Sequence, residues 1–253
     1  MTEALLISIA VGFAIGVTLG CLGGGGSILT VPALIYLIGQ TPQLAVTTSL
    51  AVVGVNSALG VYLHRAHGTL NPRVALLFGG AGMIASYTAA GLSKHLPPTL
   101  LLVAFAALML VVSLIMLRRR IPEQAEEPEL SLIKIVGTGA GVGLLTGILG
   151  VGGGFLIVPA LVMLLGLPMH QAVGTSLLVI TMNSAAGFLG HLDGIHLDMS
   201  VIAAFIAAGM IGTFAGTRLN RYLPAQRLRQ GFAVFVLLLG IFLLFDNLPK
   251  LLA

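Results

Sequence analysis

Charged residues are scarce in this sequence. Asp, Glu, Lys and Arg make up 8% of its 253 residues, whereas 57% are hydrophobic. Soluble domains carry about 25% charged residues, so this chain has too little polar surface to enclose a water-soluble globule. The composition therefore predicts an integral membrane protein, built from apolar segments of about 20 residues.

Acidic residues are missing from the middle of every apolar segment, and so are Lys and Arg. A buried carboxylate relay, as in an ion pump, and an acidic site, as in a cation carrier, are therefore disfavoured. A carboxylate pair or a Ser/His/Asp set cannot be assembled at membrane depth either, so the chain is predicted not to be an enzyme. The eight acids are Glu3, Glu123, Glu126, Glu127, Glu129, Asp193, Asp198 and Asp246.

Cysteine is limited to Cys21, so no intrachain disulfide can form. Neither a CxxC motif nor a Cys/His spacing typical of a metal site occurs, and no metal or cofactor is expected. The first 20 residues carry one charge, Glu3, and lack the basic region of a signal peptide. They are predicted to form a membrane helix that stays on the mature chain.

A glycine-rich stretch that occurs twice is the feature around which the chain is organised. Residues 20–34 read GCLGGGGSILTVPAL, and residues 147–161 read GILGVGGGFLIVPAL. A repeat that continues in one register, polar residues included, predicts a duplicated module. The offset of 127 residues aligns Pro32 with Pro159, Thr48 and Ser49 with Thr175 and Ser176, Asn56 with Asn183, and His64 with His191.

The apolar segments predict an all-α, polytopic transmembrane protein. Residues 118–131 form a polar linker with two prolines and four of the eight acids, which separates a first transmembrane repeat (1–117) from a second (132–253). The expected helical segments are 4–20, 27–39, 43–63, 74–93 and 98–117 in the first repeat, and 132–149, 155–166, 170–190, 198–217 and 225–246 in the second.

The second segment of each half is too short to span a bilayer. About a dozen residues rise about 18 Å as a helix, whereas the hydrocarbon core is about 30 Å thick. Each half is therefore predicted to have four full spans and one half-helix, which starts after the glycines at Ser27 or Phe155. Non-helical backbone at membrane depth must be buried in protein or line a wet cavity, so both glycine loops are expected inside the molecule.

The positions of Lys and Arg favour halves of opposite orientation. With five crossings in each half, ten basic residues fall on one side and two on the other, whereas four crossings split them seven to five. Basic residues concentrate in cytoplasmic loops, so the first count predicts inverted repeats, a cytoplasmic linker and both termini outside. The ten are Arg65, Arg73, Arg118, Arg119, Arg120, Lys134, Arg218, Arg221, Arg227 and Arg229, and the two are Lys94 and Lys250.

Inside the membrane, the groups left to bind a ligand are backbone, hydroxyl and amide groups. These groups can donate hydrogen bonds to an anion. A helix that starts after glycines presents free N–H groups and a dipole end of about half a positive charge. Glycine also lets a ligand approach the backbone closely. The two loops are predicted to face one substrate site, formed by Gly23, Gly24, Gly25, Gly26, Ser27, Thr48, Ser49, Asn56, Gly150, Gly152, Gly153, Gly154, Thr175, Ser176 and Asn183.

Several of these residue types have a structural alternative. Small residues let membrane helices pack closely, which is the preferred interpretation of scattered glycines such as Gly79, Gly80 and Gly209. Asn56 and Asn183 fit interhelical hydrogen bonding as well as they fit substrate binding.

The repeated histidines and prolines are given different roles. His64 and His191 lie at helix ends, which favours an interfacial location, and they are the candidates for proton coupling because imidazole titrates near neutrality. Pro32 and Pro159 are expected in the first turns of the half-helices, in a structural role.

Taken together, the doubled glycine loop, the Val-Pro-Ala-Leu sequence after it, and the repeated Thr-Ser and Asn-Ser pairs resemble the sulfite exporter TauE/SafE family of membrane transporters, also described as toluene-sulfonate uptake permeases. The resemblance covers about residues 5–245. It implies a prokaryotic inner-membrane protein that moves small, often sulfur-containing anions. It also implies that the site residues named above line the transport site, together with Pro32 and Pro159.

The sequence therefore predicts a transporter that carries a small anion of the sulfite or sulfonate class by alternating access. Its expected partners are this substrate and the lipid bilayer, and no nucleic acid. Two alternatives stay open: a passive anion channel that uses the same helix dipoles, and a membrane scaffold without transport.

Overall fold

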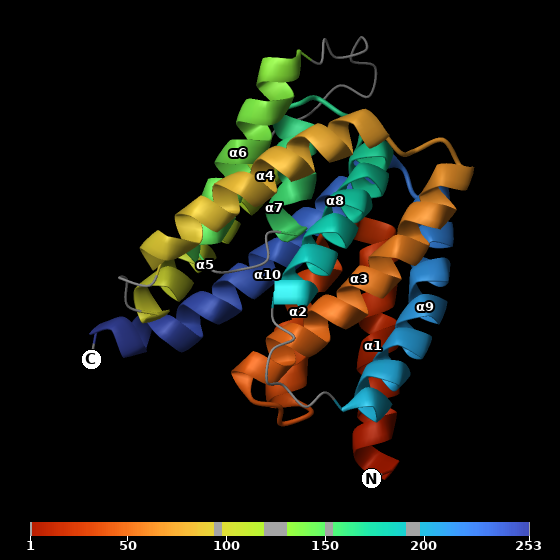
Figure 1. Ribbon diagram of the computed structural model, residues 1–253, viewed down its shortest axis with the longest axis vertical. Coiled ribbons are helices and arrows are strands. Elements are labelled where there is room, and N and C mark those ends of the chain that lie inside the picture. The colour runs from red at the N-terminus through yellow and green to blue at the C-terminus, as the bar shows by residue number, and fades with distance from the viewer. Residues whose placement is uncertain (1, 94–97, 119–130, 150–153, 191–197, 253) are drawn as a thin grey trace.

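The computed structural model describes residues 2–93, 98–118, 131–149, 154–190 and 198–252, and every regular element in these ranges is an α-helix (Figure 1). The predicted all-α, polytopic fold is confirmed. The helices follow the predicted order, with ends that differ by a few residues. They are α1 (Thr2–Leu22), α2 (Gly25–Tyr36), α3 (Pro42–Ala66), α4 (Pro72–Ser93), α5 (Pro98–Arg118), α6 (Leu132–Leu149), α7 (Gly154–Met163), α8 (Met169–Gly190), α9 (Met199–Tyr222) and α10 (Ala225–Leu252).

Two of these helices are much shorter than the rest. α2 has 12 residues and α7 has 10, so they rise about 18 and 15 Å and cannot cross a bilayer. The other helices described have 18 to 28 residues, which gives each half the four long helices and one short helix predicted. By length and composition, α3, α5, α8, α9 and α10 are long and apolar enough to span a membrane.

The long helices pack in four main pairs, which are α1 with α9, α4 with α6, α5 with α10, and α3 with α8; α2 contacts α7 as well. In the repeat, α6 is the counterpart of α1, and α7, α8, α9 and α10 are the counterparts of α2, α3, α4 and α5. The α1–α9 pair therefore corresponds to the α6–α4 pair. Each other pair joins a helix to its own counterpart. Figure 1 shows that counterpart helices run in opposite directions, since α1 rises from the N-terminus at the bottom and α6 descends from the top.

Glycines allow the paired helices to approach until their backbones touch. A methyl group at Gly16 would collide with the backbone of Gly209, and one at Gly143 would collide with Gly82. Such close contacts replace the hydrophobic driving force that is absent between helices in lipid. The packing role predicted for Gly209 is confirmed, and a methyl group at Gly79 would lie 3.4 Å from Val179. Gly80 differs, because a methyl group there would have no neighbour within 4 Å.

Candidate functional site

A two-residue glycine turn joins α1 to α2. α1 ends at Leu22, Gly23 has a φ of +71°, and Gly24 is the N-cap of α2. Glycine adopts a positive φ without the steric penalty that a side chain would bring. The turn therefore depends on glycine at position 23.

The predicted starts of both half-helices were wrong by one or two residues. α2 starts at Gly25 and not at Ser27, and α7 starts at Gly154 and not at Phe155. Glycine has a low helix propensity, but tertiary contacts routinely override propensity. The glycine run of the first half is therefore partly helical, and its extended part is shorter than expected.

The first glycine turn lies directly against the start of α7. A methyl group at Gly24 would collide with the carbonyl oxygen of Gly154, and one at Gly154 would collide with the Ser27 hydroxyl. A methyl group at Gly23 would lie 2.5 Å from Ser176 Oγ and 3.2 Å from Val158. Segments far apart in the sequence thus touch, backbone to backbone, at the N-termini of the two short helices. We call this contact, formed by Gly23, Gly24, Ser27, Gly154 and Ser176, the glycine junction.

In the part of the chain that the structure describes, no acidic side chain lies in the first turn of α2 or α7 to compensate their positive ends. Neither helix has an acidic residue in its first turn, and no side chain caps α2 at Gly24. The Ser27 hydroxyl donates to the Gly24 carbonyl oxygen over 2.7 Å, so it does not accept from an N-terminal N–H group through that bond. Each helix end carries about half a positive charge, and an anion placed between two such ends is stabilised by both.

The predicted hydroxyl residues of α3 and α8 are buried, but their hydrogen bonds differ. Ser49 Oγ donates to the Val46 carbonyl over 2.8 Å, and its counterpart Ser176 Oγ donates to the Val173 carbonyl over 2.8 Å. Both bonds lie within one helix turn. The threonines that precede these serines, Thr48 and Thr175, differ from each other in hydrogen bonding.

Thr175 Oγ1 accepts a hydrogen bond from the backbone N–H of Asn71 over 3.1 Å and so supports the start of α4. Its counterpart Thr48 is fully buried, and Thr48 Oγ1 has no hydrogen-bond partner in the part of the chain that the structure describes. A buried hydroxyl without a partner costs free energy, so Thr48 is the better candidate for contact with a bound ligand.

The amide of Asn56 is also buried without a partner. Asn56 has no exposed surface, and neither Nδ2 nor Oδ1 bonds to any described residue. It packs against Gly209, where a methyl group would collide with Nδ2. Its counterpart Asn183 is partly exposed, and Asn183 Oδ1 is likewise unpartnered among the described residues. Buried polar groups in native proteins are nearly always paired with protein, water or ligand, so these amides are candidates for contact with water or a ligand.

The predicted position of the repeated prolines was wrong. Pro32 is the eighth residue of α2 and Pro159 the sixth of α7, so both lie inside the helix and not in its first turn. Even from starts at Ser27 and Phe155, both prolines would lie beyond a first turn of about four residues, and the earlier starts place them further inside the helix. Proline has no N–H group, so neither residue can donate to the carbonyl four positions earlier. Gly150, Gly152, Gly153 and His191 lie outside the described residues.

A row of polar residues on α9 was not predicted. Thr213, Thr217 and Asn220 are buried on one face of this helix, interleaved with glycines. Neither threonine hydroxyl has a partner among the described residues. The spacing of four and three residues is the signature of a single helix face, and it was the available signal in the sequence.

A pocket of about 340 Å³ lies where the ends of α3 and α9 meet the start of α8. We call it the mouth pocket. It contains His64, whose Nδ1 lies 2.8 Å from Thr69 Oγ1 and whose side chain is 2% exposed. Its lining residues are His64, His67, Thr69, His170, Thr217, Asn220 and Arg221.

Comparison with known proteins gives a consistent match over nearly the whole chain. The family model described as sulfite exporter TauE/SafE matches residues 8–243. A probable membrane transporter protein of Xylella fastidiosa is 31% identical over 258 residues, which cover 99% of each chain. The probable membrane transporter protein YdhB of Bacillus subtilis is 26% identical over 247 residues, covering 95% of this chain and all of YdhB. No solved structure matches the chain.

Proposed function

Because the chain belongs to the sulfite exporter TauE/SafE family of membrane transporters, we propose that it carries a small, sulfur-containing anion across the membrane by alternating access. The glycine junction is the proposed site. The family supports transport and the sulfite or sulfonate class, and the helix ends at the junction support a negatively charged substrate.

The contact between Gly24 and Gly154 carries this proposal. It places the positive ends of two half-helices against each other, with no acidic residue in the first turn of either. Discontinuous helices whose N-termini point at anionic groups are a recurring feature of transporter sites. Packing alone does not require two uncompensated helix ends to meet.

Inverted repeats are proposed from the arrangement of the helices. Exchanging α1–α5 with α6–α10 reproduces the main packing pairs, and counterpart helices run in opposite directions in Figure 1. Alternating access is then a relative movement of two similar halves around a fixed site.

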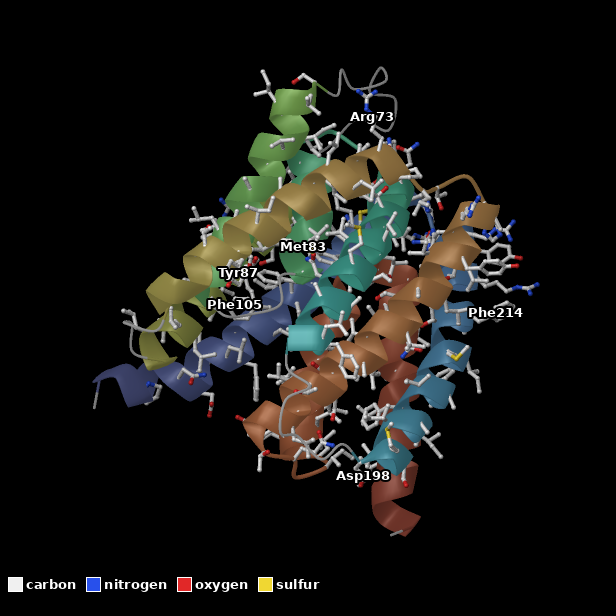
Figure 2. All side chains as sticks on the ribbon, in the orientation of Figure 1. Arg73, Met83, Tyr87, Phe105, Asp198 and Phe214 are labelled. Carbon is white, nitrogen blue, oxygen red and sulfur yellow. The ribbon has the colours of Figure 1, made fainter. Side chains whose placement is uncertain are left out.

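We place the linker on the cytoplasmic side of a prokaryotic inner membrane. The end of α5 and the start of α6, which flank the linker, lie at the top of Figure 1, whereas both chain ends lie towards the bottom. Figure 2 shows Arg73 at the upper end and Asp198 at the lower end. The position of Arg73 at the same end as the linker agrees with the positive-inside rule.

Replacing Gly24 tests the site directly. Gly24→Val places a branched side chain against the Gly154 backbone, so we expect it to abolish uptake of labelled sulfite and methanesulfonate by proteoliposomes. Gly141→Val is the matched control, because a methyl group at Gly141 has no neighbour within 4 Å. Both variants are checked for membrane insertion and for a monodisperse elution profile. A Gly24→Val protein that transports as fast as the control contradicts the proposed site.

The channel and scaffold alternatives are separated by the kinetics of the unaltered protein. A carrier gives saturable flux and counterflow, in which unlabelled substrate inside the vesicle accelerates uptake of labelled substrate. A channel gives no counterflow. A scaffold gives no flux at all.

A further inference from the structure

The mouth pocket has the chemistry of an anion site and is lined by residues other than those of the glycine junction. Its lining offers a guanidinium, three imidazoles, an amide and two hydroxyls, and none of its lining residues is acidic. Arginine is a permanent cation with a rigid fork of donors that suits oxyanions. The volume of about 340 Å³ is within the range of about 300–1,000 Å³ typical of small-molecule sites.

The polar groups of the pocket are graded from exposed to buried. His67 and Arg221 are exposed, whereas Thr217 is 3% exposed and Asn220 1%. An anion can therefore meet the permanent charge of Arg221 first and neutral donors further in. The anion can then lose its water in steps, with protein donors replacing the water at each step. This lowers the free-energy cost of desolvation.

The inner wall of the pocket is tied to the helix that precedes the glycine junction. Asn220 Nδ2 donates to the Cys21 carbonyl over 2.7 Å, and Asn220 Oδ1 lies 2.9 Å from His170 Nδ1. Cys21 precedes the Gly23 turn by two residues. A single amide thus connects the start of α8, the end of α9 and the end of α1.

Unpaired polar atoms continue from the pocket along α9. Thr217 lines the pocket, and its Oγ1 is buried without a partner among the described residues. Thr213 Oγ1, one turn further in, is also buried without such a partner. One more turn leads to Gly209, which packs against the unpartnered amide of Asn56. These atoms form a line of free hydrogen-bonding groups from the pocket into the membrane region.

We propose that the mouth pocket is a second binding site for the transported oxyanion, where it is held between solution and the glycine junction. Arg221 and Thr217 bind it, and Asn220 fixes the wall. This inference rests on the proposed transport of an anion, and it adds a separate site with its own residues.

The test is sulfite and methanesulfonate binding to the purified full-length protein, measured by calorimetry, together with flux in proteoliposomes. Arg221→Gln removes the charge of the pocket, and Arg218→Gln is its control, an exposed arginine of the same helix outside the pocket lining. Thr217→Val removes the unpaired hydroxyl. Its control is Thr18→Val, because Thr18 Oγ1 already bonds to the Ala14 and Ile15 carbonyls.

We expect Arg221→Gln to weaken binding about tenfold, the loss typical of a hydrogen bond to a charged group. Thr217→Val should weaken it a few-fold, and both controls should bind within twofold of the unaltered protein. If the unaltered protein binds and transports the anions and the pocket variants bind them as their controls do, the second site is contradicted. The proposed function is not affected by that result.

Failure of the proposed function gives a different result. Binding that depends on Arg221 and Thr217, without flux in vesicles, supports the pocket and contradicts transport. An unaltered protein that binds neither anion contradicts both.

Discussion

The two short helices correspond in sequence, yet one is enclosed and the other is not. In α7 every residue from Gly154 to Val162 is buried. In α2 the counterparts of this stretch include Ser27, Ile28 and Val31, which are partly exposed. Duplication of a sequence therefore does not duplicate its environment, and α7 is the better-packed of the pair.

The threonines beside the short helices also differ, because the one in the second half has a hydrogen-bond partner and the one in the first half has none among the described residues. Thr175 has a backbone partner in Asn71, whereas Thr48 has none among the described residues. The two threonines therefore differ in hydrogen bonding although their local sequences match. A carrier that alternates between two states needs halves that resemble each other in sequence and differ in environment at any one time. On the proposed mechanism, α2 and its neighbours are the side that changes.

The largest expected effect is on the stability of the enclosed helix. Phe155 is fully buried and packs edge to face on Phe105, with ring centroids 4.9 Å apart. Phe155→Ala should lower the free energy of unfolding in mixed micelles by about 3–5 kcal/mol, the range for removal of a buried aromatic ring. Its counterpart Ile28 is partly exposed, so Ile28→Ala should cost clearly less.

Equal losses at Phe155 and Ile28 would break the comparison between α7 and α2. They would mean that α2 is as firmly packed as α7. The Phe105→Ala variant adds a further test. Because the two rings are in contact, the double variant should lose less free energy of unfolding than the sum of the two single variants.

The ten helical segments, two of them half-helices, could be predicted because they depend on local composition and length. Apolar runs fix where helices lie in a membrane, and a dozen residues are too few to span it in any tertiary context. The starts at Gly25 and Gly154 could not be predicted in the same way. They depend on contacts between segments about 130 residues apart, such as the contact of Gly24 with Gly154.

The candidate site was predictable as a set of residue types but not as a set of contacts. The repeat pointed equally to Thr48 and Thr175, because their local sequences match. Their difference comes from Asn71, which is 104 residues from Thr175. Asn220 was missed because its partner, the Cys21 carbonyl, is a backbone group 199 residues away.

A smaller effect is expected at the two threonines. Thr175→Val removes the acceptor of the Asn71 N–H group, and an unpaired buried donor costs about 1–3 kcal/mol. Thr48→Val removes no bond in the described structure and should change stability by less than about 0.5 kcal/mol. Thermal unfolding of the two variants in one detergent measures the difference. A loss at position 48 as large as the one at position 175 would show that Thr48 has a structural partner.

The smallest effect on stability, with a large effect on transport, is expected at Asn56. Both amide atoms are buried without a partner among the described residues, so Asn56→Leu should be neutral or slightly stabilising, within about 0.5 kcal/mol, because it removes an unpaired polar group. If the amide binds substrate, sulfite flux should fall while unfolding stays unchanged. Loss of stability with flux retained would instead assign Asn56 to interhelical hydrogen bonding. Asn183→Leu is the counterpart in the second half, where the side chain is partly exposed, and a weaker effect on flux there would confirm that Asn56 contacts the substrate more closely than Asn183 does.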